Sequence, residues 1–145
     1  MSKPKTQAQL DRATDQRLRK TYGVGLDWYE DRLLLQNGGC AVCRRPPGTK
    51  RLHVDHDHGW KKVKVTSTNY PDCWQAVAVY NGTEFYSTGR TKSVVVKEVK
   101  DKLKQASIRG LLCYTHNAGL QKFQDSPSFL RSAADYLESH QGVQT

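Results

Sequence analysis

Two short pairs of metal-ligating residues, far apart in the chain, most constrain how this protein can fold. The first pair is Cys40-x-x-Cys43 and the second is Cys113-x-x-His116. Zinc prefers four tetrahedral ligands, and a Cys-x-x-Cys turn presents two of them while the second pair supplies the others. Four protein ligands leave no position for water, so we expect a structural zinc ion that holds the two pairs together.

The cysteines also permit other arrangements. The chain has four of them, enough for two disulfides. Residues 1–20 are polar and contain no apolar signal region, so we expect a protein that is not exported, and a reducing compartment favours zinc over disulfides. Cys73 is an alternative fourth ligand to His116. We prefer His116, because Cys73 has no partner at ligand spacing and an unused thiol is the ordinary case.

The bulk composition favours one modest domain with a polyanionic partner. The chain has 145 residues, 37% of them hydrophobic, and a formal net charge of +9. Nucleic acid is the commonest partner of such a basic protein, although a membrane surface or a simply solvated protein would fit the charge alone. No stretch approaches the roughly 20 apolar residues that span a bilayer. We therefore expect a soluble cytoplasmic protein without membrane contact.

A second constellation lies between the two ligand pairs. It is Val54-Asp55-His56-Asp57-His58, and Asn117 directly follows the last zinc ligand. Phosphodiester hydrolysis needs a base and a cation, and an imidazole such as His56 can take a proton from water near neutral pH. The oxygens of Asp55 and Asn117 suit Mg²⁺ or Mn²⁺. Because neighbours in a regular strand point to opposite faces, Asp55 and His56 can share this site only if the strand ends or bulges there.

Other polar residues near this constellation have less specific assignments. His58 is a candidate for orienting the phosphate or bracing the loop, and Asp57 for a hydrogen bond to a histidine. We interpret His53 as a polar strand residue. Arg109 is a candidate contact for the scissile phosphate, although a surface arginine fits equally well. Histidine and aspartate pairs on strands are often only a solvated face. The catalytic interpretation depends on three features together: the tight clustering, the position between the zinc pairs, and the oxygen ligand that follows the second pair.

Local patterns predict the elements around these motifs. Residues 7–20 form a marginal helix or a mobile arm, and a capping box at Asp27 begins a helix that stops at Gly38-Gly39. Alternation over residues 51–55 predicts a strand with its apolar side chains on one face. Residues 117–123 can form a short helix. Ser126-Pro127 then begins an amphipathic helix, which we expect to pack on the core.

Residues 60–107 have the pattern of an insert with its own organisation. Alternating residues 74–80 lead into the turn Asn81-Gly82 and predict a hairpin, and a helix follows from about Lys92. The insert has nine basic residues against four acidic ones. One face of its helix carries Lys97, Lys100 and Lys104, which are candidates for contacting phosphates. The alternative is a solvated helix with a pair between Glu98 and Lys102.

Taken together, the motifs resemble the recombination endonuclease VII family, a phage branch of the HNH nucleases. The resemblance covers residues 22–59 and 108–140. It is carried by Tyr22-Gly23-Val24, Trp28-Tyr29, Gly38-Gly39-Cys40-Ala41-Val42-Cys43, Leu52-His53-Val54-Asp55-His56-Asp57-His58, Arg109-Gly110-Leu111-Leu112-Cys113, Asn117-Ala118-Gly119-Leu120 and Phe123 to Leu137.

The resemblance implies an α+β fold: a zinc-stabilised ββα-metal (His-Me finger, HNH) core with flanking helices and an inserted β-hairpin plus helix. It implies cleavage of branched or duplex DNA, as in Holliday-junction resolution, giving a 5′-phosphate and a 3′-hydroxyl, with homodimers common. It assigns His56 as the base and Asp55 and Asn117 as ligands of a catalytic cation. The expected organisation is a basic arm or helix over residues 1–21 and a nuclease domain over 22–145 that contains the insert.

Two departures from the family pattern bear on this interpretation. The fourth zinc ligand is usually cysteine, whereas this chain has His116, which zinc also accepts. The two matching blocks are normally joined by a short linker, and here the insert separates them. The competing function class is a zinc-stabilised nucleic-acid-binding module without catalysis, which would tolerate the loss of His56. Chemistry alone does not distinguish DNA from RNA as the partner.

Overall fold

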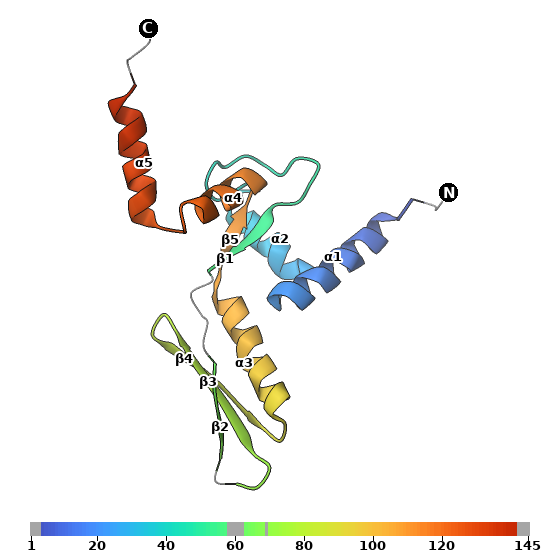
Figure 1. Cartoon of the computed structure of the whole chain (residues 1–145). Helices are drawn as coiled ribbons and strands as arrows, with labels where there is room; N and C mark the ends of the chain where they lie inside the picture. The colour runs from blue at the N-terminus through green and yellow to red at the C-terminus, as the bar shows by residue number, and fades with distance from the viewer. Residues whose placement is uncertain (1–3, 58–62, 69, 142–145) are drawn as a thin grey trace.

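Helices and two small antiparallel sheets make up the chain in the computed structural model, which describes residues 4–57, 63–68 and 70–141 (Figure 1). The described helices are α1 (Gln7–Tyr22), α2 (Leu26–Leu35), α3 (Lys92–Ala106), α4 (Tyr114–Lys122) and α5 (Pro127–Ser139). The strands are β1 (His53–His56), β2 (Lys64–Ser67), β3 (Trp74–Tyr80), β4 (Thr83–Gly89) and β5 (Ile108–Leu112). The predicted α+β class is confirmed. No helix in the described part is long and apolar enough to cross a bilayer.

The central sheet pairs β1 with β5 although 51 residues separate these strands in sequence. Leu52 and Val54 are both buried, as the alternation predicts, and they join Leu111 and Leu112 in a core that also takes in Leu18 of α1. Helix α4 contacts both strands. The two strands and α4 therefore carry most of the predicted site residues: Asp55 and His56 in β1, Arg109 in β5, and His116 and Asn117 in α4.

Helix α1 is capped at its own start and contributes a side chain to the start of α2. Thr6 and Gln9 form a capping box at the start of α1. The capping box expected at Asp27 is wrong, because α2 starts one residue earlier, at Leu26, and its N-cap is Gly25 without a side-chain bond. Asp15 of α1 accepts a hydrogen bond from the Leu26 amide at 2.8 Å. A side chain of α1 therefore satisfies one of the free N–H groups at the start of α2.

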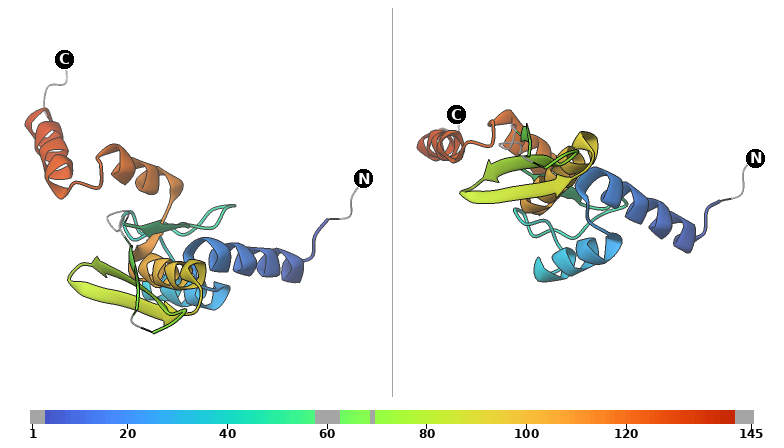
Figure 2. Two further views of the ribbon diagram at one scale, coloured as in Figure 1. Left: turned by 60° about the horizontal axis from the view of Figure 1, so that its bottom comes forward. Right: turned by 90° about the horizontal axis from the view of Figure 1, so that it is seen from below.

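The insert has a hydrophobic core of its own, which α3 forms with one face of the sheet β2-β3-β4 (Figure 2). The predicted hairpin is confirmed: Asn81 and Gly82 have φ values of 49° and 76°, the conformation of a two-residue turn between β3 and β4. Strand β2 adds an edge that the sequence did not predict. The buried residues of this core are Ala76, Ala78, Val95, Val99 and Leu103.

Among the described residues, a seam between Asp57 and the insert residues Tyr80 and Ser107 joins the insert to the central sheet. The Asp57 amide donates to the Ser107 carbonyl at 2.9 Å, and the Tyr80 hydroxyl donates to Asp57 at 3.0 Å. Asp57, after β1, and Ser107, before β5, thus lie side by side. The division of the chain at residues 21 and 60–107 stays a prediction.

One alternative for α3 and one expectation for α5 are wrong. Glu98 and Lys102 do not pair with each other: Glu98 binds the Ser87 hydroxyl and Lys102 donates to the Tyr86 carbonyl, so both hold α3 against β4. Ser126 does cap α5, accepting a hydrogen bond from the Phe129 amide. The helix, however, does not pack on the core. It projects away from the sheets, and Leu137 is 62% exposed (Figure 1).

Candidate functional site

The two predicted ligand pairs meet in one cluster. The facing atoms of Cys40, Cys43, Cys113 and His116 all lie within 4.8 Å of one another. His116 Nδ1 is 3.0 Å from the Cys113 sulfur and 3.7 Å from the Cys40 sulfur. A tetrahedral zinc ion with bonds of 2.0–2.3 Å would separate its ligands by about 3.5–3.8 Å. The cluster therefore has the size and the chemistry of a zinc cage.

Local backbone geometry delivers each pair to this cluster. The turn after α2 is closed by the Cys40 amide, which donates to the Arg45 carbonyl at 2.9 Å. Gly39 is required in that turn because a Cβ atom there would collide with the Arg44 carbonyl. On the other side, Cys113 is the N-cap of α4, so His116 lies one turn into the helix.

Side-chain contacts hold the turn against the central sheet. Gln36 donates to the Leu111 carbonyl and accepts from the Leu111 amide, both at 2.9 Å. The Ala41 amide also donates to the Leu111 carbonyl, at 3.0 Å. These bonds place the first cysteine pair beside the end of β5, where the second pair follows. The cage therefore closes across two segments that the chain itself keeps far apart.

The electrostatics of the cluster favour a metal-binding thiolate. Burial raises the pKa of the Cys40 thiol, but the amides of Cys43, Cys113 and Val42 together outweigh this effect and bring the pKa to about 6. Thiolates, not thiols, bind zinc. Cys73 lies in the insert and is outside the cluster, which contains His116 in its place. The preference for His116 over Cys73 as the fourth ligand is consistent with this geometry.

Asp55, His56 and Asn117 line one pocket of about 180 Å³. Asp55 faces Gly110 across the sheet, whereas His56 faces Ile108, so Arg109 is an extra residue in β5. This β-bulge is the irregularity that the sequence requires if Asp55 and His56 are to serve one site. Asn117 reaches the pocket from the first turns of α4, one residue after His116.

An arginine clamps the acidic side of this pocket. Arg109 binds both oxygens of Asp55 at 2.8 Å, and it approaches Asp125 at 3.3 Å. The hydrogen bond to Asp55 is the main cause of a raised pKa for Arg109. The sequence left two alternatives for Arg109, a contact to the scissile phosphate or a surface arginine. In the structure its guanidinium group lies between two carboxylates, and the same group borders the pocket.

The donor set of the pocket fits a hard divalent cation. Asp55 and Asn117 offer oxygen atoms, which Mg²⁺ prefers. A carboxylate has about four lone-pair sites, so the two bonds to Arg109 leave others available. One oxygen of Asp125, Oδ1, is buried without a hydrogen-bond partner among the described residues. Such an orphaned acceptor is costly unless a cation or water satisfies it.

Three further residues line the pocket that sequence reasoning missed: Tyr22, Gln121 and Asp125. The Tyr22 ring meets the His56 imidazole edge-on at 5.4 Å between centroids. Gln121 lies one helical turn after Asn117, and that spacing was a usable signal. Asp125 had no local signal, because it follows α4 in a turn where Gln124 and Asp125 both have positive φ values, 56° and 53°.

The remaining predicted residues of this region have different surroundings. His53 is exposed, borders the same pocket and lies 5.8 Å from the Tyr114 ring. Asp57 accepts the hydrogen bond from Tyr80 and so belongs to the seam with the insert. His58 lies outside the described residues.

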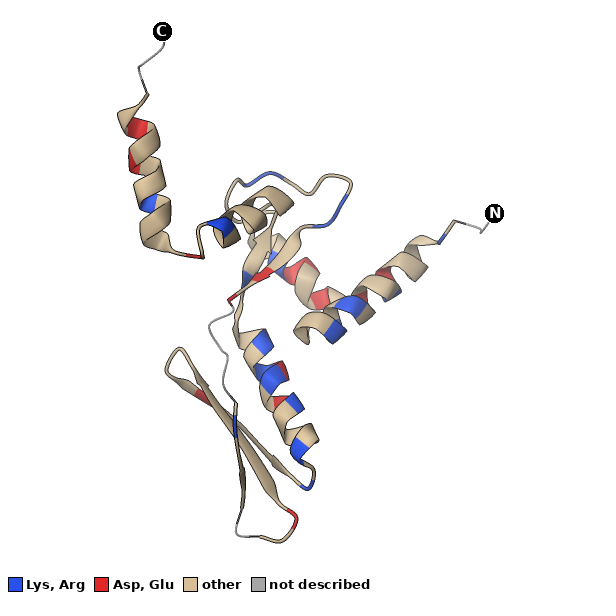
Figure 3. Cartoon of the chain, in the orientation of Figure 1, with Lys and Arg blue, Asp and Glu red and all other residues tan. Residues whose placement is uncertain are grey.

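Lys97, Lys100 and Lys104 of α3 line a groove of about 460 Å³ together with Arg19 and Lys20 of α1. Figure 3 shows the basic residues of α3 and α1 in blue. Lys97 and Lys104 both pair with Asp101, at 2.6 and 3.5 Å. Lys100 has no ion pair within the described part of the chain. The groove is lined by the basic residues Arg19, Lys20, Lys97, Lys100 and Lys104 and by a single acidic residue, Asp101.

Comparison with known proteins gives one match. A family model described as recombination endonuclease VII matches residues 15–139. No curated protein and no solved structure matches the chain.

Proposed function

Because this chain belongs to the recombination endonuclease VII family, we propose that it is a metal-dependent endonuclease that hydrolyses phosphodiester bonds in DNA, with branched or junction DNA as the preferred substrate. The observation that carries this proposal is the pocket that Asp55, His56 and Asn117 share beside the Cys/His cluster. We further propose that β1, β5 and α4 form an HNH-type ββα-metal unit.

In this proposal His56 takes a proton from a water molecule, and the water oxygen adds to the scissile phosphorus. The bond from phosphorus to the 3′ oxygen breaks, which leaves a 5′-phosphate and, after protonation, a 3′-hydroxyl. The contact with Tyr22 supports a fixed orientation of the imidazole. Asp55 and Asn117 would hold a Mg²⁺ or Mn²⁺ ion, which would stabilise the charge that develops on the leaving oxygen.

Arg109 supports this chemistry in two ways. Its bonds to both Asp55 oxygens fix the orientation of that carboxylate. Its position at the pocket is also compatible with a contact to the scissile phosphate, which stays a prediction. The role of His58 likewise stays a prediction, because that residue is not among those described.

The zinc ion would hold the frame of this site. Asn117 follows His116 directly, so an ion bound at Cys40, Cys43, Cys113 and His116 would fix the start of α4 and with it the Asn117 amide. The basic groove between α1 and α3 supports contacts to the DNA backbone by Lys97, Lys100 and Lys104.

A cleavage assay tests the proposal. Wild-type protein, His56→Ala and the control His140→Ala are incubated with plasmid and with four-way branched DNA, with and without Mg²⁺ or Mn²⁺. We expect metal-dependent cleavage by the wild type and a loss of about 10²- to 10⁴-fold in rate for His56→Ala. His140 is exposed near the end of α5, so its variant should cut at the wild-type rate.

The competing class predicts a different outcome. If the wild type and His56→Ala bind DNA equally and neither cuts it with any divalent cation, the protein is a zinc-stabilised binding module.

A homodimer also belongs to the proposal, supported by the exposed apolar side chains Phe129, Tyr136 and Leu137 on α5. The mass of the protein in solution, measured by light scattering, tests it, and a monomer at all concentrations would contradict it.

A further inference from the structure

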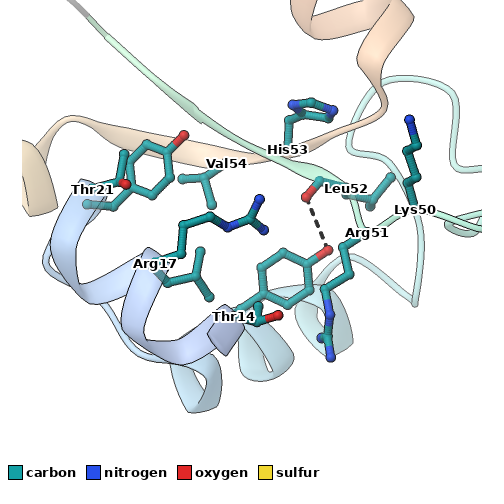
Figure 4. A pocket seen from close by; sticks show the side chains of 11 residues that line it. Thr14, Arg17, Thr21, Lys50, Arg51, Leu52, His53 and Val54 are labelled. Atoms are coloured by element: carbon teal, nitrogen blue, oxygen red, sulfur yellow. Dashed lines mark hydrogen bonds between the residues drawn. The ribbon is translucent and has the colours of Figure 1, made fainter. Parts of the chain in front are cut away.

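A second and larger pocket, of about 510 Å³, adjoins the candidate catalytic pocket (Figure 4). One wall is the second half of α1, and the other is formed by residues 50–54 at the start of β1. Tyr22, His53 and Val54 line both pockets. The two pockets are therefore neighbours on the same part of the surface, close enough for one extended ligand to reach both.

The two pockets carry opposite charges. The catalytic pocket contains the carboxylates of Asp55 and Asp125 and one arginine. The second pocket is lined by Arg17, Lys50 and Arg51 and by no acidic residue. A divalent cation fits the first, and an anion fits the second.

Arg17 is the cation best placed to receive that anion. Figure 4 shows its side chain extending from α1 toward β1, into the space between them. Arg17 forms no ion pair within the described residues, whereas Arg51 already pairs with Asp11 at 2.8 Å. The nearby Tyr29 hydroxyl is also engaged, because it donates to the Leu52 carbonyl at 3.3 Å. The guanidinium group of Arg17 thus retains its donors for a ligand.

We infer that this pocket binds the backbone phosphate of the nucleotide next to the scissile phosphate, with Arg17 as its main ligand. The inference rests on the proposed function, and it identifies the part of the substrate that α1 holds. Size supports the division of labour. The catalytic pocket, at about 180 Å³, is large enough for a hydrated cation and phosphate oxygens. The second pocket has the volume of a small-ligand site.

The walls of the pocket suit a nucleotide better than a free inorganic anion. Leu18, Tyr29 and Val54 give it an apolar floor, against which a sugar ring can pack. Thr21, labelled in Figure 4, adds a hydroxyl at the rim. An arginine above an apolar floor offers both a charged and a nonpolar contact, as a nucleotide does.

The test measures DNA binding without cleavage. Full-length protein carrying His56→Ala is titrated against a fluorescently labelled duplex at several salt concentrations, alone and combined with Arg17→Gln or Arg12→Gln. Arg12 is an exposed residue of the same helix that lines neither pocket, so its variant matches the change in charge. One lost phosphate contact lowers the salt slope, d log K/d log[salt], by about 0.9 in magnitude.

We expect Arg17→Gln to reduce the slope by about 1 and the affinity by about tenfold at 0.1 M salt, while Arg12→Gln changes the affinity less than about twofold. Arg17→Lys should restore most of the slope, because it keeps the charge. Equal slopes for Arg17→Gln and Arg12→Gln, with both variants folded by circular dichroism, would overturn the inference. Because cleavage plays no part, a failure of the proposed nuclease activity would appear separately, in the assay on the wild type.

Discussion

The central sheet and the insert are built on different principles, although each has its own hydrophobic core. The core of the insert joins β3, β4 and α3, which follow one another directly in the chain. The core of the central sheet joins segments from both ends of the chain, and its pockets and Cys/His cluster are assembled from those distant segments. The insert can form from local contacts, whereas the central sheet depends on closing a long loop.

This difference explains why the chain tolerates a large insert between its two ligand pairs. The entropic cost of closing a flexible loop rises only slowly with its length. The hydrogen bond between Asp57 and Ser107 joins the residue after β1 to the residue before β5. The insert therefore connects the two antiparallel strands as a shorter loop would. The four zinc ligands therefore come together although the insert separates the two pairs in sequence.

The largest difference between the two regions is expected when the Cys/His cluster is disrupted. We expect Cys40→Ser to abolish zinc binding and to unfold the central sheet, because zinc contributes roughly 10–16 kcal/mol in small zinc peptides, as much as or more than the stability of a small domain. Hydrogen exchange should show lost protection in β1 and β5 and retained protection in β3, β4 and α3. Zinc content is measured alongside.

Cys73→Ser is the matched control, because Cys73 is a half-buried cysteine of the insert outside the cluster. It should keep one zinc ion per chain and wild-type protection in the central sheet. Loss of zinc in the control instead would identify Cys73 as a ligand. Full protection of β1 and β5 in Cys40→Ser would show that the sheet does not need the metal.

A smaller perturbation addresses the insert. Leu103 is fully buried in its core, so Leu103→Ala should destabilise the insert by about 2–5 kcal/mol through lost contacts and a residual cavity. Exchange in β3, β4 and α3 should accelerate, whereas the zinc content and the protection of the central sheet should not change.

Val94→Ala, at a position of α3 that is 49% exposed, provides the control and should cost less than about 1 kcal/mol. The two regions would have to be regarded as one cooperative unit if Leu103→Ala accelerated exchange equally in β1 and β5.

The smallest expected effect concerns the basic groove between α1 and α3. Lys20 and Lys100 line the basic groove from α1 and α3, and neither forms an ion pair with a described residue. In the His56→Ala background, Lys20→Gln with Lys100→Gln should lower the magnitude of the salt slope of DNA binding by about 2. The stability of the protein should stay within about 0.5 kcal/mol of the parent.

Lys5→Gln with Lys122→Gln removes the same charge from exposed positions outside the groove. A slope that changes equally in both double variants would mean that the groove contributes only through the net charge of the protein. In that case α3 is a solvated helix and the insert has no specific contact with DNA.

Much of the local structure follows from sequence because it depends on residues a few positions apart. The hairpin turn at Asn81-Gly82, the cap at Ser126 and the burial of Leu52 and Val54 are of this kind. The helix start at Asp27 was predicted wrongly because the side chain that accepts from the first amide of α2, Asp15, comes from another helix. The expected packing of α5 failed for a related reason: an amphipathic pattern predicts a helix but does not say whether a neighbour covers its apolar face.

The candidate site divides in the same way. The sequence by itself determined which atoms can bind metals, because ligand chemistry and short spacings such as Cys-x-x-Cys are properties of the covalent chain. Only the tertiary structure decided that Arg109 bulges from β5 to clamp Asp55, that Asp125 enters the pocket, and that Arg17 faces a second one. These placements depend on contacts between segments far apart in sequence, whose geometry is set by the packing of the whole fold.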